Sequence, residues 1–398
     1  MSRGRWLNID VLAVGLGVVA GLLSCTTSDV SNVDQIAIQR AILDDATARF
    51  ILPKLATLQA KTDALDAAFV GGDTPACVAL ASDTGGLQLA AIRLAWSQAK
   101  DAAKALEPVS FGPVKTLRLG TEFDFWPTRP SSIVNALTTD TAWSAADMVK
   151  LSNAAKGLPA LGWLLYTAPT TGDEFEVASA PTVTAALLAD GARRCHFAAA
   201  VARHTRVATQ QLVDAWARDK GNYAAALQFA GREGVATGAS GWSSPYSNSL
   251  EALSDVINAM VGQLHALEVN KTGRALGDKN GGVASPDALE SPYGRRSLAD
   301  LKANLAGFAA LYGQGTKRGL RGALLKHSTA IATDIDAALS LAAKQLDAIT
   351  PPLATALTAE RMKVVAVQQT FGQLRVLFAS DVANVFGITV TFTDADGD

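Results

Sequence analysis

Apolar residues recur at helical spacing along most of this chain. The clearest example is residues 250–267, where they are separated by three and four positions, as in a helix that buries one face in a bundle. Asn248 and Glu251 are placed as an N-cap residue and its partner three positions later. The apolar stripe consists of Leu250, Leu253, Ile257, Met260, Leu264 and Leu267.

Similar stripes predict helices elsewhere, and Pro53 is expected to kink the first of them. Only residues 387–392 alternate in the manner of an extended segment. The sequence therefore predicts an all-α fold of two helical bundles packed side by side, with a minor extended segment at the C-terminus. The other expected helical stretches are residues 33–69, 75–106, 181–219, 297–312 and 351–379.

A helix-poor segment rich in Thr, Pro and Gly follows Thr167 and runs to Pro181. A chain of 398 residues is long enough for two domains at about 150 residues each. We therefore expect an N-terminal helical bundle over residues 33–170 and a C-terminal helical bundle over residues 171–398.

The first residues have the pattern of a secretion signal. Arg3 and Arg5 precede an apolar run of about 13 residues that ends just before Ser24 and Cys25. A transmembrane helix needs about 20 apolar residues, so the run is too short for a membrane anchor. We predict a lipoprotein signal peptide at residues 1–24, lipidation of Cys25 and a tether at residues 25–32. The lipid at Cys25 would attach a bacterial protein to the membrane.

The residue after the lipidated cysteine is Thr26 and not Asp, which favours the outer membrane, with the protein facing the periplasm. Cys77 and Cys195 would then lie in an oxidising compartment. A disulfide between them would close a loop of 118 residues (195 − 77) and contribute about 4–5 kcal/mol in the loop-entropy model. Two buried free thiols are the alternative.

Composition excludes several classes of protein. Lys and Arg number 35 against 37 Asp and Glu, so the chain lacks the basic excess of a nucleic-acid-binding protein. Hydrophobic residues make up 49% of the chain, a share that excludes an intrinsically disordered protein. The sequence has no HExxH, P-loop, dinucleotide-binding glycine or GxSxG motif, so the common hydrolase and nucleotide-binding functions lack their essential residues.

One pair of residues is spaced like metal ligands in a helical bundle. His265 and Glu268 are three positions apart on an expected helix and can face the same way. The alternative is a hydrogen-bonded surface pair. His196 and His204 are eight positions apart, about 12 Å along a helix, which is too far to share one ion.

Several segments, in order over about residues 33–398, together resemble the imelysin-like family of bacterial periplasmic and outer-membrane lipoproteins. Members are classed as metallopeptidases and are associated with iron uptake. The resemblance implies two helical bundles, iron or another divalent metal as cofactor, and a partner protein in iron uptake or in the periplasm. The matching segments are FGP at 111–113, FDFWP at 123–127, KGLPAL at 156–161, ESPY at 290–293, RSL at 296–298 and VTFTDADGD at 390–398.

The same resemblance argues against catalysis. Family members with a metal or peptidase site carry a GxHxxE motif, in which His and Glu could act as ligand and base. Aligned on Gly157, this chain has Pro159 in place of the His and Gly162 in place of the Glu. Neither side chain can bind a metal or move a proton. One alternative is a metallopeptidase-like enzyme with a relocated site at His265 and Glu268, and another is an interaction scaffold for a membrane complex.

Polar and aromatic residues in two irregular segments form a candidate ligand site between the bundles, because binding residues concentrate in such segments. Each has a structural alternative: Asp124 could cap a helix or pair with Arg295 or Arg296 across the bundles, and Trp126 could belong to the core. The expected function is a non-catalytic component, associated with iron uptake, that binds a ligand or a metal. The candidate ligand-binding residues are Asp124, Trp126, Arg129, Tyr293, Arg295 and Arg296.

Overall fold

The computed structural model describes residues 34–70, 76–83, 85–139, 143–168, 178–232 and 244–391. Every regular element within these ranges is a helix, which confirms the all-α prediction. The signal peptide, the tether and the lipidation site expected at residues 1–32 lie outside the described residues, as does the acidic C-terminal tail.

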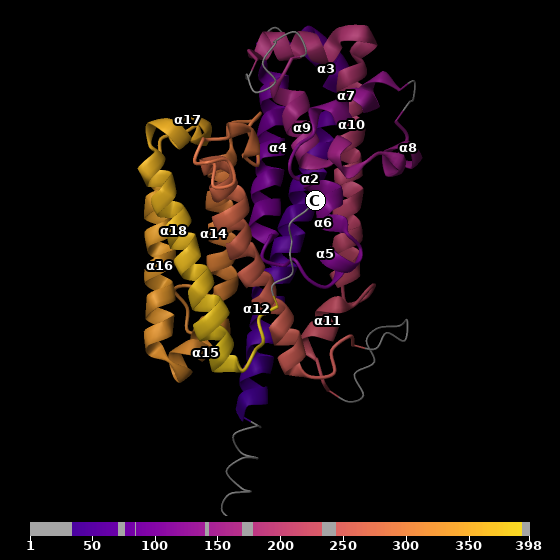
Figure 1. Ribbon diagram of the computed structural model, residues 1–398. Coiled ribbons are helices and arrows are strands. Elements are labelled where there is room, and N and C mark those ends of the chain that lie inside the picture. The colour runs from indigo at the N-terminus through magenta and orange to yellow at the C-terminus, as the bar shows by residue number, and fades with distance from the viewer. Residues whose placement is uncertain are drawn as a thin grey trace, which may run out of the picture.

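The first bundle is built around α2 (Leu52–Val70), α4 (Leu87–Leu106), α9 (Gly157–Tyr166) and α10 (Ala180–Trp216), which Figure 1 shows in indigo to magenta. Helix α2 packs against both α4 and α10. Shorter elements surround this core: α3 (Ala76–Ser82), α5 (Pro113–Thr116), α6 (Leu119–Phe123), α7 (Pro130–Thr138), α8 (Ala145–Lys150), η2 (Asn153–Ala155) and α11 (Tyr223–Gln228).

Helix α10 follows the boundary that we expected at residue 170, but it packs against α2 and α9. The packing therefore groups α10 with the helices that precede it. Residues 189–192 have non-helical backbone angles, with Asp190, Gly191 and Ala192 in the left-handed region, so α10 consists of two helical parts.

The second bundle contains the orange to yellow helices of Figure 1. Its first helix is continuous from α12 (Ser249–His265) through η3 (Ala266–Gly273) to α13 (Arg274–Leu276). The remaining elements are η4 (Pro286–Ala288), α14 (Ser297–Tyr312), α15 (Gly319–His327), α16 (Thr329–Asp347), α17 (Leu353–Ala359), α18 (Arg361–Val376), η5 (Leu377–Val382) and α19 (Ala383–Phe386).

Three of the long helices contain a π-helical segment. The first is η1 (Ala46–Ile51), between the helical residues 34–45 and α2, and Pro53, which cannot donate a backbone hydrogen bond, lies two residues after its end. The other two are η3 and η5. Such segments often occur at functional sites, and η3 supplies residues to the site described below.

Local capping explains where two of the helices begin. Asn248 Oδ1 accepts a hydrogen bond from the Glu251 backbone N–H at 2.9 Å, which confirms the predicted N-cap of α12. The single helix expected over residues 75–106 is wrong, because the chain breaks between α3 and α4. Gly86 has a φ of 70°, and the Asp83 carboxylate accepts from the backbone N–H groups of residues 87 and 88.

The two bundles meet where α4 packs against α14, side by side in Figure 1. Gly307 allows their backbones to approach closely, because a Cβ there would lie 2.2 Å from the carbonyl oxygen of Ala105. A single hydrophobic cluster extends through both bundles. The bundles therefore share one core, so residues at the α4 and α14 contact are held in fixed positions.

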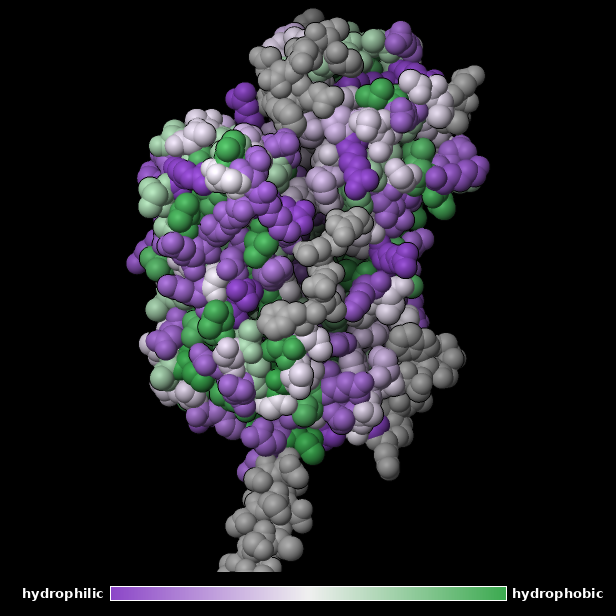
Figure 2. Space-filling view, in the orientation of Figure 1, coloured by the Kyte–Doolittle hydropathy of each residue, from purple (hydrophilic) through white to green (hydrophobic). Residues whose placement is uncertain are grey.

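The surface in Figure 2 mixes hydrophilic residues with scattered hydrophobic ones over both bundles. None of the helices within the described ranges is long and apolar enough to cross a membrane. The described part of the extended segment expected at residues 387–392 is tied to α12 by Asn258. The Asn258 side chain donates to the carbonyl oxygen of Thr389 and accepts from the backbone N–H of Thr391, so the segment is hydrogen-bonded to a side chain of α12.

Candidate ligand site between the bundles

A buried network of charged residues lies where the two bundles meet. Its cations are Lys100 and Lys104 on α4 and Lys271 on η3. The carboxylates come from three separate places: the C-terminal end of α4, the segment after α6 and the loop before α14. They belong to Glu107, Asp124 and Glu290.

Lys104 lies at the centre of this network and is 1% exposed. Its ammonium nitrogen is 2.7 Å from Asp124 Oδ2 and 2.8 Å from Glu107 Oε1, and it also contacts Glu290. Oxygens of the three carboxylates lie within 4.8 Å of one another, a spacing that could hold a metal ion. In this chain the Lys104 ammonium binds to all three carboxylates.

Lys271 and Lys100 form ion pairs with the same three carboxylates. Lys271 Nζ is 2.6 Å from Glu107 Oε2, 3.0 Å from Glu290 Oε2 and 2.9 Å from the amide oxygen of Asn304. Lys100 Nζ is 2.8 Å from Asp124 Oδ1. Each carboxylate therefore contacts two ammonium groups.

The electrostatics of the network favour the charged forms. Burial disfavours the charged form of Lys104, but Asp124, Glu107 and Glu290 outweigh burial and raise its pKa well above the ordinary value. Burial also opposes ionisation of Glu290 and Asp124, but the neighbouring lysines outweigh it and lower the pKa of both carboxyl groups. Lys104, Glu290 and Asp124 are therefore charged at neutral pH.

A second set of charged residues, at the start of α14, also connects α14 with α4. Arg296 Nε is 2.7 Å from Asp300 Oδ1, and the same guanidinium contacts Asp101 and Ser97 on α4. The Asn304 side chain donates to the carbonyl oxygen of Lys104 at 2.9 Å. Polar contacts therefore connect α4 and α14 along their shared length.

A cavity of about 440 Å³ opens beside the buried network. This volume lies in the range typical of small-molecule sites, about 300–1,000 Å³. Its apolar wall contains Leu106, Phe123, Phe125 and Trp126, and its polar wall contains Glu107, Asp124, Asn270, Lys271, Arg274 and Glu290. Asp124 and Trp126, two residues expected from the sequence, therefore lie in one cavity.

Three residues that line the cavity have a buried atom without a hydrogen bond, and one of these atoms, Glu290 Oε2, is held in an ion pair 3.0 Å from Lys271 Nζ. The other two belong to Asn270 and Arg274. Asn270 is 7% exposed, and its Oδ1 atom has no hydrogen-bond partner among the described residues. The Nε atom of Arg274 is also buried without a partner, and its guanidinium forms no ion pair within the described ranges. A buried unsatisfied polar atom costs about 1–3 kcal/mol, so a ligand that pairs these two atoms would recover that cost.

Trp96 packs against α9 at Gly162, the position where the sequence alignment on Gly157 expects the glutamate of the motif. Its indole N–H donates to the carbonyl oxygen of Leu158 at 2.8 Å. A Cβ on Gly162 would lie 2.8 Å from the indole ring, and one on Gly294 would lie 2.6 Å from it. A glutamate at position 162 is therefore incompatible with Trp96 in this position.

The start of α9 depends on a glycine at position 157. Gly157 has a φ of 81°, and a Cβ there would lie 2.8 Å from the carbonyl oxygen of Phe123. The backbone therefore requires a glycine at position 157, and Pro159 is buried in the helix that follows.

The other expected ligand residues lie in different surroundings. Arg129 is exposed and its guanidinium lies 5.5 Å from the Phe125 ring, while Arg295 is exposed on the loop before α14. Tyr293 is buried. Arg296 pairs with Asp300 and Asp101, and Asp124 pairs with lysines, so neither forms the Asp–Arg pair between the bundles that the sequence allowed.

His265 and Glu268 lie near the junction of α12 and η3. Glu268 pairs with Arg375 of α18 at 2.5 Å. Within the described ranges, the one group of three potential metal ligands is Glu107, Asp124 and Glu290, and it includes neither His265 nor Glu268. A metal site at this pair stays a prediction.

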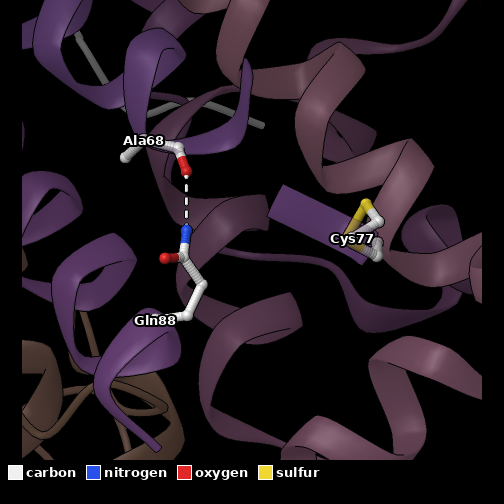
Figure 3. Close-up of a disulfide and its surroundings, with 4 residues drawn as sticks. Ala68, Cys77 and Gln88 are labelled. Carbon is white, nitrogen blue, oxygen red and sulfur yellow. Dashed lines mark hydrogen bonds between the residues drawn. A yellow bond between two sulfur atoms is a disulfide. The ribbon is translucent and has the colours of Figure 1, made fainter. Parts of the chain in front are cut away.

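Cys77 of α3 and Cys195 of α10 form a disulfide, with their Cα atoms 5.8 Å apart. Figure 3 shows this bond beside the contact between α2 and α4, where the Gln88 side chain donates to the Ala68 carbonyl oxygen at 3.3 Å. Of the two states that the sequence left open, the structure has the disulfide.

A larger cavity of about 1,090 Å³ follows the outer side of α10 and includes His196 and His204 in its lining. His204 Nε2 is 2.9 Å from Glu122 Oε2, which also pairs with Lys156 at 2.8 Å. Burial lowers the pKa of His204 despite this contact, which favours the neutral imidazole.

Sequence reasoning did not find the lysines or Asn270 and Arg274. Lys100 and Lys104 are four positions apart on one face of an expected helix, so they could have been identified as a pair, but not as buried. Glu290 opens one of the segments quoted for the family resemblance and was not weighed as a site residue.

Two packed helical bundles with a polar cavity between them define the class of this protein, and comparisons with known proteins assign the family. The imelysin model, peptidase family M75, matches residues 51–379, and the chain belongs to this family. No curated protein matches the chain.

Solved structures of the same fold support this assignment. An iron-regulated protein A precursor from Parabacteroides distasonis superposes with a TM-score of 0.71 at 17% identity, covering 88% of this chain and 95% of that one. An imelysin-like protein from Psychrobacter arcticum superposes with a TM-score of 0.64 at 15% identity, covering 90% and 98%. At these identities the likeness shows the fold.

Proposed function

We propose that this protein is a non-catalytic binding protein that holds a small ligand in the cavity between its two bundles. The observation that carries the proposal is the pair of unsatisfied buried polar groups, on Asn270 and Arg274, that line this cavity. In a folded chain such groups are normally paired, and a ligand with matching polar atoms would pair them.

We propose that this protein is not a catalyst because of the residues that stand at the His and Glu positions of the GxHxxE motif. Pro159 and Gly162 offer no ligand or base, and the Trp96 ring lies against Gly162. A peptidase working at this position would need both a metal ligand and a proton acceptor. The residues present supply neither of them.

The cluster of three carboxylates does not fit a resident metal ion. The Lys104 ammonium contacts all three carboxylates, and Lys100 and Lys271 balance the remaining charge. An ion would have to displace a buried ammonium group. The solved relative named for iron regulation supports an iron-related setting, where we propose that this protein binds a ligand or a partner protein.

The proposed location is the periplasmic side of the outer membrane of a bacterium, with the lipid at Cys25 as the anchor. The signal pattern of residues 1–24 supports this location. The Cys77–Cys195 disulfide also supports it, because disulfides persist in oxidising compartments.

Ligand-observed NMR with a panel of small aromatic fragments tests the proposal on the chain from residue 26. We expect wild type and the exposed-site control Ala310→Phe to bind fragments that Ala266→Phe, which fills the cavity, does not bind. Equal binding by all three proteins would contradict the assignment of the cavity.

The enzyme alternative is tested on the same preparation. We expect no hydrolysis of casein and no stoichiometric iron, zinc or copper by elemental analysis. Hydrolysis that disappears in His265→Ala would establish the relocated metal site and overturn the proposal.

A further inference from the structure

The charges around the interbundle cavity point to the class of its ligand, an inference that rests on the proposed function. The three carboxylates, Glu107, Asp124 and Glu290, are matched by the three ammonium groups of Lys100, Lys104 and Lys271. These six groups sum to zero charge. The network therefore has no net negative charge that a bound cation would have to balance.

Arg274 adds one positive charge that this balance does not include. It lines the cavity, its Nε atom is buried without a hydrogen-bond partner, and it forms no ion pair with any residue that the structure describes. A guanidinium with unsatisfied N–H groups binds carboxylates, because both its charge and its geometry match two carboxylate oxygens.

Asn270 also lines the cavity and has an unpaired buried atom, its Oδ1. Ala266, Asn270 and Arg274 follow one another at intervals of four along the continuous helix from η3 to α13, and all three line the cavity. The buried Asn270 carboxamide can donate its N–H or accept through its oxygen, depending on how the amide is turned. When the amide is turned so that its nitrogen takes the position of the unpaired Oδ1, Asn270 can donate to a carboxylate that Arg274 holds.

Apolar, largely aromatic side chains also line the cavity, and this apolar wall consists of Leu106, Phe123, Phe125 and Trp126. This wall would bury an apolar body and exclude water from it. The Trp126 indole N–H is already used, because it donates to the Leu289 carbonyl oxygen at 3.2 Å. The apolar wall thus offers contact area with few hydrogen bonds.

From these observations we propose that the cavity binds a small organic carboxylic acid with an apolar, preferably aromatic, body. Arg274 and Asn270 bind the carboxylate group, and the aromatic wall binds the body. The lysine network supports the site by keeping the three protein carboxylates neutralised.

A matched pair of probes tests this inference by isothermal titration calorimetry of wild type: 2-naphthoate and its uncharged isostere 2-naphthamide. We expect 2-naphthoate to bind at least tenfold more tightly than 2-naphthamide. Arg274→Gln should lose at least tenfold in affinity for 2-naphthoate, with little change for 2-naphthamide. Asn270→Leu should also weaken 2-naphthoate. The exposed control Arg49→Gln should bind both probes as wild type does.

Equal affinity for the two probes, no binding of 2-naphthoate, or unchanged 2-naphthoate affinity in Arg274→Gln would each overturn the inference. The fragment experiment with Ala266→Phe separates this failure from failure of the proposed function. If neutral fragments occupy the cavity and 2-naphthoate does not, the cavity is a binding site for another class of ligand. If no fragment of any charge responds to Ala266→Phe, both proposals fail.

Discussion

Trp96 excludes a larger side chain at two neighbouring glycines. Its ring lies against Gly162 and Gly294, and its indole N–H is bonded to the Leu158 carbonyl oxygen. The bulk of the ring takes the space that a motif glutamate would need. Gly162 is therefore a packing requirement of Trp96.

We predict that Gly162→Ala destabilises the protein by about 1–3 kcal/mol, the usual cost of overpacking a core, because the new Cβ would lie 2.8 Å from the Trp96 ring. Urea unfolding measures the effect. The matched control is Gly262→Ala on α12, where a Cβ meets nothing within 4 Å and stability should rise by about 0.4–1 kcal/mol. Equal effects at the two positions would contradict the packing role of Trp96.

Lys104 is the residue on which the buried network most depends. Replacing its ammonium with an apolar group would leave Glu107, Asp124 and Glu290 close together with too little compensating charge. We predict that Lys104→Met lowers the free energy of unfolding by about 3–5 kcal/mol, as expected when one partner of a buried ion pair is removed.

Chemical denaturation of Lys104→Met checks this prediction against Lys344→Met. Lys344 is exposed on α16, so its replacement should change stability by no more than about 0.5 kcal/mol. A loss below about 1 kcal/mol in Lys104→Met would mean that the network contributes little to stability.

Individual residues of the candidate site could be predicted from the sequence only where they lie in a segment without regular apolar periodicity. Asp124 and Trp126 lie in such a segment, and both line the cavity. Lys100, Lys104 and Lys271 lie within helices, where lysine usually faces solvent, so nothing local indicated that they are buried. Their partners are as far as 186 residues away in sequence, a distance over which a single sequence carries no pairing signal.

At the scale of elements, the helices followed from apolar periodicity and their ends from capping. Asn248 was identifiable as a cap because its side chain acts on a backbone N–H three residues away. The break between α3 and α4 was missed although the polar residues 82–86, Ser-Asp-Thr-Gly-Gly, mark a turn, because the apolar residues on both sides of them were taken together as one helix. The π-helical form of η3, which places Asn270 and Lys271, has no sequence pattern that we could use.

The disulfide is an element-scale constraint, since it ties the short helix α3 to α10 across 118 residues of sequence. We predict that the double variant Cys77→Ala, Cys195→Ala is less stable than wild type by about 4–5 kcal/mol, mainly because its unfolded chain is less restricted. Denaturant unfolding with and without dithiothreitol measures this difference. Wild type should lose stability on reduction and the double variant should not, so a reductant effect in both proteins would contradict the assignment.

At the scale of the whole molecule, the buried charges connect the bundles and make stability depend on pH. The folded-state pKa of Glu290 is lowered by the neighbouring lysines, which outweigh its burial. Its stabilising contribution is therefore present above the unfolded pKa of about 4.3 and is lost as the pH falls below that value. Lys104 has a raised pKa, so its contribution is complete below its unfolded pKa and is lost only as the pH rises through the higher folded value.

We predict that wild type is more stable than Glu290→Gln by about 3–5 kcal/mol at pH 7, and that the difference shrinks as the pH falls from about 5 to 2. Urea unfolding at a series of pH values measures both proteins. The exposed control Asp219→Asn should stay close to wild type throughout. A difference for Glu290→Gln that grows towards low pH would reverse the sign and contradict the ionised network.

The arrangement of the bundles was predictable in outline from helix periodicity and from the family resemblance. The packing of α10 with the preceding helices depends on long-range contacts with α2 and α9, which no local pattern reports. The cavity exists because α4, η3 and the segment after α6 converge there, so its volume and its unsatisfied groups become apparent only in three dimensions.

The measurement that most directly tests the interbundle cavity as the functional site is a crystallographic fragment screen of the wild-type protein from residue 26. We predict fragment density between α4 and η3, in contact with Arg274 and the Trp126 wall, with the Trp96 ring unmoved against Gly162. Fragments gathered elsewhere, for example along the outer side of α10, with the interbundle cavity empty, would contradict the central claim.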